Sequence, residues 1–382
     1  MDGRTTDESH PLQVTIRPAF EDGQRRVRVV DLFSGCGGLT LGVAQAAQVS
    51  DASLDVRLAI DIDDAAIKVY RHNFPKARAV AGSVESYFDG ALGQGCTNTE
   101  ASTKKRCGAV DILIGGPPCQ GHSDLNNHTR RNDPKNALYV RMARAAQVLK
   151  PSIVLIENVP AVRHDKGDAL GLTTAHLAQN GYSVYHGVIE LQQLGVAQTR
   201  RRHILLASRV VTVDPAHVLG ELGKADNRRS TNLEWAIGDL ASVPSTSEFD
   251  TPPRASETNQ KRMSYLLEHD LYDLPNSQRP PCHQDEHSYK SMYGRLRWDA
   301  PAQTITSGFG SIGQGRYMHP DVPRALTPHE AARIQGMPDY FQFTEISRRS
   351  SLATIIGNLV PPQLSKEIFT AILPSLALPT TR

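Results

Sequence analysis

The chain has 382 residues, 39% of them hydrophobic, which exceeds the usual size of one domain and suffices for a large core. Its 42 Lys and Arg nearly balance its 40 Asp and Glu, which excludes a strongly basic protein, so any polyanion would have to bind at local patches. No apolar stretch approaches the roughly 20 residues that span a bilayer, which argues against a membrane protein.

The five cysteines are odd in number and irregularly spaced, and no apolar run begins the chain. We therefore expect a reduced, cytoplasmic protein without a disulfide framework. Cys282, His283 and His287 lie close together but lack a second pair of ligands at zinc-finger spacing, so we expect no metal site.

The first predicted strand runs from Arg26 to Leu32, after a polar stretch, residues 1–26, that we interpret as a mobile lead-in. The run F-S-G-C-G-G-L follows at once. Gly35, Gly37 and Gly38 allow a tight turn and close approach of a ligand to the backbone, which predicts a cofactor loop, with a simple tight turn as the alternative. The spacing departs from the dinucleotide-binding pattern G-x-G-x-x-G.

A second strand, L-A-I-D-I-D-D, ends in acids. A carboxylate at the tip of the second strand is placed to bind ribose hydroxyls, which makes Asp61 the predicted ribose ligand. Asp63 and Asp64 should face solvent or cap the helix predicted over residues 65–73.

The stretch from Tyr87 to Gly108 separates the third and fourth predicted strands. Ser83 and Val84 should lie at the tip of the third strand. Beyond them the chain is rich in Gly, Thr and Ser, which predicts a loop insertion whose basic triplet, residues 104–106, is a solvated surface.

The fourth strand, V-D-I-L-I, ends abruptly and leaves a cysteine at its carboxyl end. Its apolar run predicts a central parallel strand buried on both faces. Two glycines end it, and Pro117 and Pro118 then fix two φ angles, so Cys119 is held by a stiff backbone where open α/β sheets bind ligands. The alternative, a small core hydrophobe, is disfavoured by the polar neighbours of Cys119.

Glu157 ends the next buried strand, P-S-I-V-L-I-E-N-V-P, which follows a long polar loop and a helix predicted over residues 137–149. A carboxylate at the end of an apolar strand is costly unless it is used. Because it lies at the same sheet edge as Cys119, Glu157 is the predicted partner of that cysteine.

Two further strands, Gly181 to Glu190 and Arg202 to Ser208, are predicted to pair antiparallel. Alternation along the second one places Arg200 and Arg202 on one face and Arg201 on the other, facing solvent.

From Val210 to about Tyr340 prolines, serines and charges replace long periodic segments, apart from a short helix near Asn232 to Leu240. We interpret this stretch as a second lobe with little regular core, where base-reading loops can sit.

Two helices are predicted toward the end of the chain. One starts at Thr327, with a proline at its first position and Glu330 in a capping box, and stops at Gly336. The other runs from Gln363 to Leu373, where a proline stops it, and should return to the first lobe.

Six motifs in the chain resemble, in order, those of the DNA (cytosine-5)-methyltransferases: D-L-F-S-G-C-G-G-L, G-G-P-P-C-Q-G-H-S, E-N-V-P, Q-T-R-R-R, L-T-P-H-E-A-A-R-I-Q-G-M-P and G-N-L-V-P-P. The resemblance covers nearly the whole chain and implies an α/β fold: a Rossmann-like class I methyltransferase sheet, mostly parallel with an antiparallel strand, plus a smaller irregular target-recognition lobe. It places a catalytic cofactor-binding domain at 27–209, a target-recognition domain at 210–340 and a returning C-terminal segment at 341–382.

The resemblance implies methyl transfer from S-adenosyl-L-methionine to carbon 5 of a cytosine flipped out of duplex DNA. The Cys119 thiolate would add to carbon 6 and make carbon 5 nucleophilic. Glu157 would hold ring nitrogen 3 and the amino group, and Arg202, with Arg200 beside it, the carbonyl oxygen.

The resemblance also implies a cofactor site in which Phe33 and Leu138 sandwich the adenine, Asp61 binds the ribose and Ile62 packs on the base. The full set is Phe33, Ser34, Gly35, Cys36, Gly37, Gly38, Asp61, Ile62, Ser83, Val84, Pro118, Leu138 and Asn358. The residues implied to contact DNA, from the polar loop that would close over the base, are Gln120, Ser123, Arg130, Arg131 and Lys135.

Three residues depart from the family pattern. Ser83 stands where many members carry an acid that binds the adenine amino group. Ala197 replaces a proline, and Leu359 replaces a small residue on the cofactor side.

The implied partners are double-stranded DNA and a cognate restriction endonuclease in a bacterial host, for a monomer associated with the nucleoid and not with a membrane. Three alternatives stay open: the tRNA-methylating branch of the family, whose C-F-T signature is absent here; a catalytically silent DNA-binding regulator; and a nicotinamide dehydrogenase, disfavoured by the G-C-G-G spacing.

Overall fold

The structure is a computed structural model that describes residues 10–118, 137–222, 224, 231–284 and 291–381. The chain forms two compact units. The sheet unit comprises Phe20–Ser230 and Leu359–Arg382, and the second unit comprises Met1–Ala19 and Thr231–Asn358.

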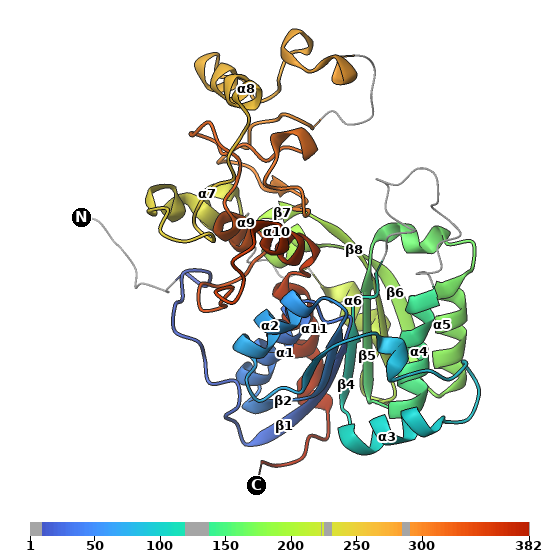
Figure 1. The fold of residues 1–382 in the computed structure, drawn as a ribbon. Helices are drawn as coiled ribbons and strands as arrows, with labels where there is room; N and C mark the ends of the chain where they lie inside the picture. Colours follow the sequence, from blue (N-terminus) through green and yellow to red (C-terminus); the bar gives the residue numbers. More distant parts are fainter. Residues whose placement is uncertain (1–9, 119–136, 223, 225–230, 285–290, 382) are drawn as a thin grey trace. The chain divides into compact units, whose positions relative to one another are not determined.

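A seven-stranded sheet in the order β3-β2-β1-β4-β5-β8-β6 organises the sheet unit (Figure 1). Strands β1 to β5 are parallel, and β8 runs antiparallel to both of its neighbours, β5 and β6. The α/β fold with one antiparallel strand is therefore confirmed. The strands are β1 Arg25–Leu32, β2 Ala52–Asp61, β3 Ala79–Ala81, β4 Ile112–Gly115, β5 Ile153–Asn158, β6 Ser183–Glu190, β7 Gln198–Thr199 and β8 Arg201–Ser208.

The two faces of this sheet bury separate apolar clusters, as the alternation of side chains along a strand requires. On β4, Leu113 packs into one cluster, and Ile112 and Ile114 pack into the other. All of β4 and β5 is buried, which confirms that these strands are covered on both faces.

Seven helices of the sheet unit are described: α1 Gly38–Val49, α2 Asp64–Asn73, α3 Asn98–Cys107, α4 Ala137–Leu149, α5 Ala169–Gln179, α6 Pro215–Glu221 and α11 Pro362–Ile372. The C-terminal helix α11 returns to this unit as predicted, because it lies against α1 (Figure 1). The Ser365 hydroxyl donates to the Leu39 carbonyl at 2.7 Å. Gly42 leaves the room for this contact, since a side chain there would clash with the Pro362 carbonyl.

The prediction of a loop from Tyr87 to Gly108 is wrong, because α3 occupies its second half. Thr97 and Glu100 form a capping box at the start of the helix. The basic triplet lies in its last turn, where positive charges interact favourably with the negative end of the helix dipole. Glu100 is fully buried and pairs with Arg144 of α4.

The second unit has its own apolar cluster, so the prediction of little regular core is corrected. Its elements are α7 Leu233–Ile237, α8 Glu257–Glu268, β9 Ala302–Gln303, α9 Pro328–Ile334 and α10 Arg349–Asn358. The predicted capping box of α9 is confirmed, with Thr327 and Glu330 bonded to each other's backbone. Helices α8 and α10 were not predicted.

The chain ahead of β1 contributes to both units. Leu12 and Phe20 are 3% and 2% exposed. The Leu12 carbonyl accepts from Asp339 N within the second unit, and the Phe20 carbonyl accepts from Leu54 N of β2 within the sheet unit. Leu12 and Phe20 are therefore each hydrogen-bonded within the unit to which they belong.

Candidate functional site

Glu157 lies near the carboxyl end of β5 and is paired with an arginine of the neighbouring strand. Arg202 Nε lies 2.6 Å from Glu157 Oε1, and the two side chains are only 13% and 8% exposed. The register explains the pair: Ile204 of β8 lies opposite Glu157, so Arg202, two positions away, shares the face. A largely buried carboxylate thus keeps a charged, hydrogen-bonding partner.

The segment that leads to Cys119 is tied to the same strand end. Asn158 Nδ2 donates to the Pro117 carbonyl at 3.1 Å. A Cβ at Gly116 would lie 3.1 Å from Glu157 Oε2, so the glycine leaves the space beside the carboxylate open. Six predicted site residues lie outside the described residues: Cys119, Gln120, Ser123, Arg130, Arg131 and Lys135.

The three consecutive arginines divide between two environments. Arg200 is 3% exposed, whereas the Arg201 side chain is 62% exposed and lies 3.7 Å from Glu190. This burial agrees with the prediction that Arg201 faces solvent on the face opposite to Arg200 and Arg202.

The glycine-rich loop between β1 and α1 turns through three left-handed residues, Phe33 (φ 56°), Gly35 (φ 53°) and Gly37 (φ 100°). A Cβ at Gly37 would meet the Phe74 ring, and one at Gly38 would meet the Val360 carbonyl. Nothing lies within 4 Å of a Cβ at Gly35. Two of the glycines thus make room for the protein's own packing, and Gly35 faces open space.

Asp61 holds this loop to the tip of β2. Its Oδ2 accepts from Gly35 N at 2.8 Å and its Oδ1 accepts from Asp63 N at 2.9 Å. Burial raises the pKa of the Asp61 carboxyl, against these two hydrogen bonds, which lower it. Asp63 caps α2 by accepting from the backbone at Ala65 and Ala66, one of its two predicted roles.

The side chain of Ile62, next to Asp61, is 82% exposed. The buried Ser34 Oγ has no hydrogen-bond partner in the described part of the chain. The open space at Gly35 therefore lies in a loop that also contains the unpartnered hydroxyl of Ser34 and is bonded to the Asp61 carboxylate. The exposed apolar side chain of Ile62 follows Asp61 in the chain.

Other predicted cofactor residues occupy several environments. Burial raises the pKa of the Cys36 thiol to about 12, so it stays neutral. The Val84 side chain belongs to an apolar cluster, and Ser83 caps a short 3₁₀-helix by accepting from Glu85 N. Phe33, Pro118 and Leu138 are half-buried, and the exposed Asn358 is the last residue of α10 in the second unit.

Sequence reasoning missed two polar residues next to the predicted site. Asn158, which follows Glu157, could have been found as a second polar residue at a buried strand end. Asp31 is fully buried, accepts from Thr40 Oγ1 at 2.7 Å, and has its pKa raised to about 8 by burial. The Asp31 carboxyl is therefore largely protonated at neutral pH.

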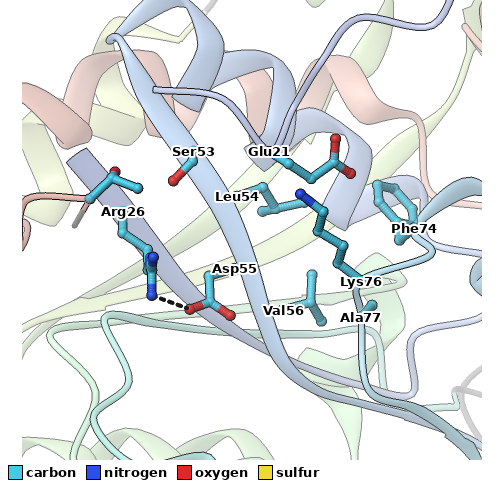
Figure 2. Close-up of a pocket in the computed structure, with 10 residues that line it drawn as sticks. Glu21, Arg26, Ser53, Leu54, Asp55, Val56, Phe74, Lys76 and Ala77 are labelled. Atoms are coloured by element: carbon cyan, nitrogen blue, oxygen red, sulfur yellow. Dashed lines mark ion pairs between the residues drawn. The ribbon is translucent and has the colours of Figure 1, made fainter. Parts of the chain in front are cut away.

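A separate cavity of about 210 Å³ lies beside the first half of β2 (Figure 2). Arg26 and Asp55, which line it, are 3.8 Å apart. Because Asp61 is at the other end of β2, this cavity is distinct from the glycine-rich loop, and none of the predicted site residues lines it.

No helix in the described part of the chain is long and apolar enough to cross a membrane.

Comparison with known proteins matches residues 27–374 to the family described as C-5 cytosine-specific DNA methylase. The chain is 44% identical over 360 residues to the type II methyltransferase M1.BsuMI of Bacillus subtilis, covering 94% of this chain and 83% of the relative. It is 29% identical to the type II methylase M.HgiDII of Herpetosiphon aurantiacus, covering 90% and 94%. The solved S. pombe Dnmt2 methyltransferase shares the fold at a TM-score of 0.63 and 16% identity, covering 92% of this chain and 100% of that one.

Proposed function

The chain belongs to the C-5 cytosine-specific DNA methylases and is a DNA (cytosine-5)-methyltransferase, and from this premise we propose the donor, the mechanism and the residues. The methyl group comes from S-adenosyl-L-methionine and goes to a cytosine flipped out of duplex DNA, through a covalent adduct of Cys119. The observation that carries this proposal is the Glu157–Arg202 pair at the strand end that also binds Pro117, two residues before Cys119.

Cys119 acts first, because carbon 5 of cytosine is a poor nucleophile. Its thiolate adds to carbon 6, and the electron pair of the 5,6 double bond then makes carbon 5 nucleophilic. Carbon 5 then attacks the methyl group, and the bond between this group and the sulfonium sulfur of the donor breaks. Loss of the proton from carbon 5 and cleavage of the carbon 6 to sulfur bond return the thiolate and release 5-methylcytosine.

Glu157 and Arg202 act on the opposite edge of the ring. Glu157 holds ring nitrogen 3 and the amino group and supplies a proton as negative charge develops, and Arg202 holds the carbonyl oxygen with Arg200 beside it. The open space at Gly116, beside Glu157 Oε2, gives the ring access to the carboxylate.

The residues around the glycine-rich loop fit the methyl donor, which supplies a sulfonium methyl group when bound. The exposed Ile62 side chain offers an apolar surface to the adenine, and Asp61 retains lone pairs for the ribose hydroxyls after its two backbone bonds. Ser34 Oγ and the open space at Gly35 lie in the same loop. Phe33 and Leu138 enclose the adenine between them.

Duplex DNA is the substrate that the family implies, and the polar loop after Cys119 is proposed to contact its phosphates through Arg130, Arg131 and Lys135. The type II relatives favour a role in restriction and modification beside a cognate endonuclease. We propose that the chain acts as a monomer.

Transfer of label from the methyl-labelled donor to duplex DNA or to tRNA tests the proposal. We expect label in duplex DNA, and none with Cys119→Ser, which still binds DNA. A duplex with 5-fluorocytosine at the target should trap wild-type protein covalently, because fluorine cannot leave carbon 5 as a proton does. Label in tRNA alone, or unchanged turnover by Cys119→Ser, would contradict the proposal.

A further inference from the structure

Helix α8 of the second unit, labelled in Figure 1, carries polar residues along one side. Met263 and Leu266 are buried and belong to the apolar cluster of this unit. The opposite face carries residues three and four positions apart, which puts them on one side of the helix: Glu257, Gln260, Lys261, Ser264 and Glu268. Tyr265 lies at the edge of this face, because it also packs against the apolar cluster. One side of the helix thus packs against the apolar cluster, and the other side exposes a row of polar groups.

This polar face forms one wall of a groove of about 940 Å³. The proline-rich segment before α8 contributes Arg254, and the chain beyond the helix contributes Gln278. All of the lining belongs to the second unit. The groove is therefore a property of that unit alone.

Two cations of the groove, Arg254 and Lys261, differ from most others in the unit, whereas a third lining cation, Arg324, is paired with Glu330 at 2.7 Å. Among its described arginines and lysines, only Arg254, Lys261 and Arg348 have side chains without a hydrogen-bond, ion-pair or ring partner. Several other arginines of the unit are paired with a carboxylate; Arg295 Nη1, for example, lies 3.0 Å from Asp270 Oδ1. Two of the three unpartnered cations thus line one groove.

The chemistry of the lining suits base edges better than phosphates. A phosphate track would be uniformly positive, whereas this groove mixes Arg254 and Lys261 with Glu257, Glu268 and amide groups. Arginine and lysine bind guanine, glutamine binds adenine, and a carboxylate accepts from the cytosine amino group. The twelve residues of α8 span about 18 Å along the helix axis, and an α-helix, about 10–12 Å in diameter with its side chains, fits the DNA major groove.

We propose that α8 enters the major groove and that Arg254 and Lys261 are specificity-determining residues that read guanine edges in the target sequence. This inference rests on the proposed function, because the ligand is the same duplex DNA.

The test compares the full chain with Arg254→Ala and Lys261→Ala. Each protein is incubated with random duplexes, and the retained DNA is sequenced; each is also expressed in a host whose methylated cytosines are mapped with their flanks. We expect each variant to lose a preference for guanine at one position, with a roughly ten- to hundredfold smaller ratio of cognate to one-base-changed DNA. Lys261→Arg, which can still donate to guanine, should restore the preference.

Arg348→Ala is the matched control, because Arg348 is an exposed and unpartnered arginine of the same unit outside the groove. It should leave the sequence preference unchanged. An equal loss of affinity for all sequences with a smaller salt dependence would indicate phosphate contacts and overturn the proposal. An unchanged preference in both groove variants, or an effect of Arg348→Ala equal to theirs, would overturn it too.

The two proposals fail separately. Selection by binding measures base preference without methyl transfer, so the groove is tested even if no labelled methyl group reaches DNA. Conversely, methylation of cytosine by wild-type protein with groove variants of unchanged preference would leave the proposed function standing and reject the role of α8.

Discussion

Replacing Glu157 by glutamine separates the chemical role of the carboxyl group from its structural one. Glu157→Gln keeps the shape and an oxygen that can accept from Arg202, but it cannot supply a proton to ring nitrogen 3. A positioned general acid contributes about 10²- to 10⁴-fold to rate. At 1.36 kcal/mol for each tenfold change, the barrier should rise by about 3–5 kcal/mol.

The structural cost of the same change is smaller. Hydrogen bonds to charged groups contribute about 1.5–3 kcal/mol, and the amide retains part of this, so we expect to lose about 1–2 kcal/mol of the free energy of unfolding. From a total of about 5–15 kcal/mol, such a loss leaves about 99% or more of the protein folded. Unfolding therefore cannot produce the expected fall in rate.

Single-turnover transfer of a labelled methyl group to duplex DNA measures the chemical step, and calorimetric titration measures affinity for S-adenosyl-L-methionine. Glu157→Gln should slow the first and leave the second unchanged. Arg201→Gln is the control, since Arg201 is exposed and lies on β8 next to Arg202, the ion-pair partner of Glu157, but on the other face of that strand. A Glu157→Gln rate within about threefold of wild type, or equal losses of rate and cofactor affinity, would refute the reasoning.

Three further substitutions test contacts that the structure shows. Asn158→Ala removes the bond to the Pro117 carbonyl and should slow single-turnover transfer about tenfold or more while cofactor affinity stays unchanged; equal rates would reject a positioning role. Arg144→Ala leaves Glu100 buried without its partner and should lower the free energy of unfolding in urea by about 3–5 kcal/mol, most of it recovered in Arg144→Met with Glu100→Gln. The Asp31 carboxyl, with its pKa raised to about 8 by burial, stabilises the fold in its protonated form, so its contribution is present below about pH 4 and is lost as the pH rises through 8. Asp31→Asn should therefore become more stable relative to wild type between pH 5 and pH 8, by up to about 4 kcal/mol at 1.36 kcal/mol per unit, in thermal unfolding at each pH; a constant difference would contradict this.

The sequence predicted the sheet because its strands carry their own signal. β4 and β5 are continuous apolar runs ended by glycine or polar residues, and the glycines after β1 predict the turn that follows this strand. The capping box at Thr327 is equally local, since it needs only residues three apart. Patterns of this kind can be recognised from neighbouring residues in the sequence, without knowing which distant residues they contact in the folded chain.

The missed features depend on partners far along the chain. Helix α3 has few apolar residues, and the Arg144 that pairs with its buried Glu100 is 44 residues further on. Helix α8 is held by Met263 and Leu266 packing in a cluster with later residues such as Ile312. The link from Asn158 to Pro117 joins positions 41 residues apart. No local pattern predicts such pairs.

The distribution of charge in the second unit bears on how a protein of net charge +2 can recognise DNA. Nonspecific affinity for DNA comes mainly from phosphate neutralisation, which needs uncompensated cations. Aspartates compensate several arginines of this unit, including Arg295, Arg297 and Arg316. A surface with few free cations gains little from phosphates of any sequence, so discrimination must come from correctly matched base edges. Removing one free cation from the groove should therefore affect sequence preference more than total DNA affinity.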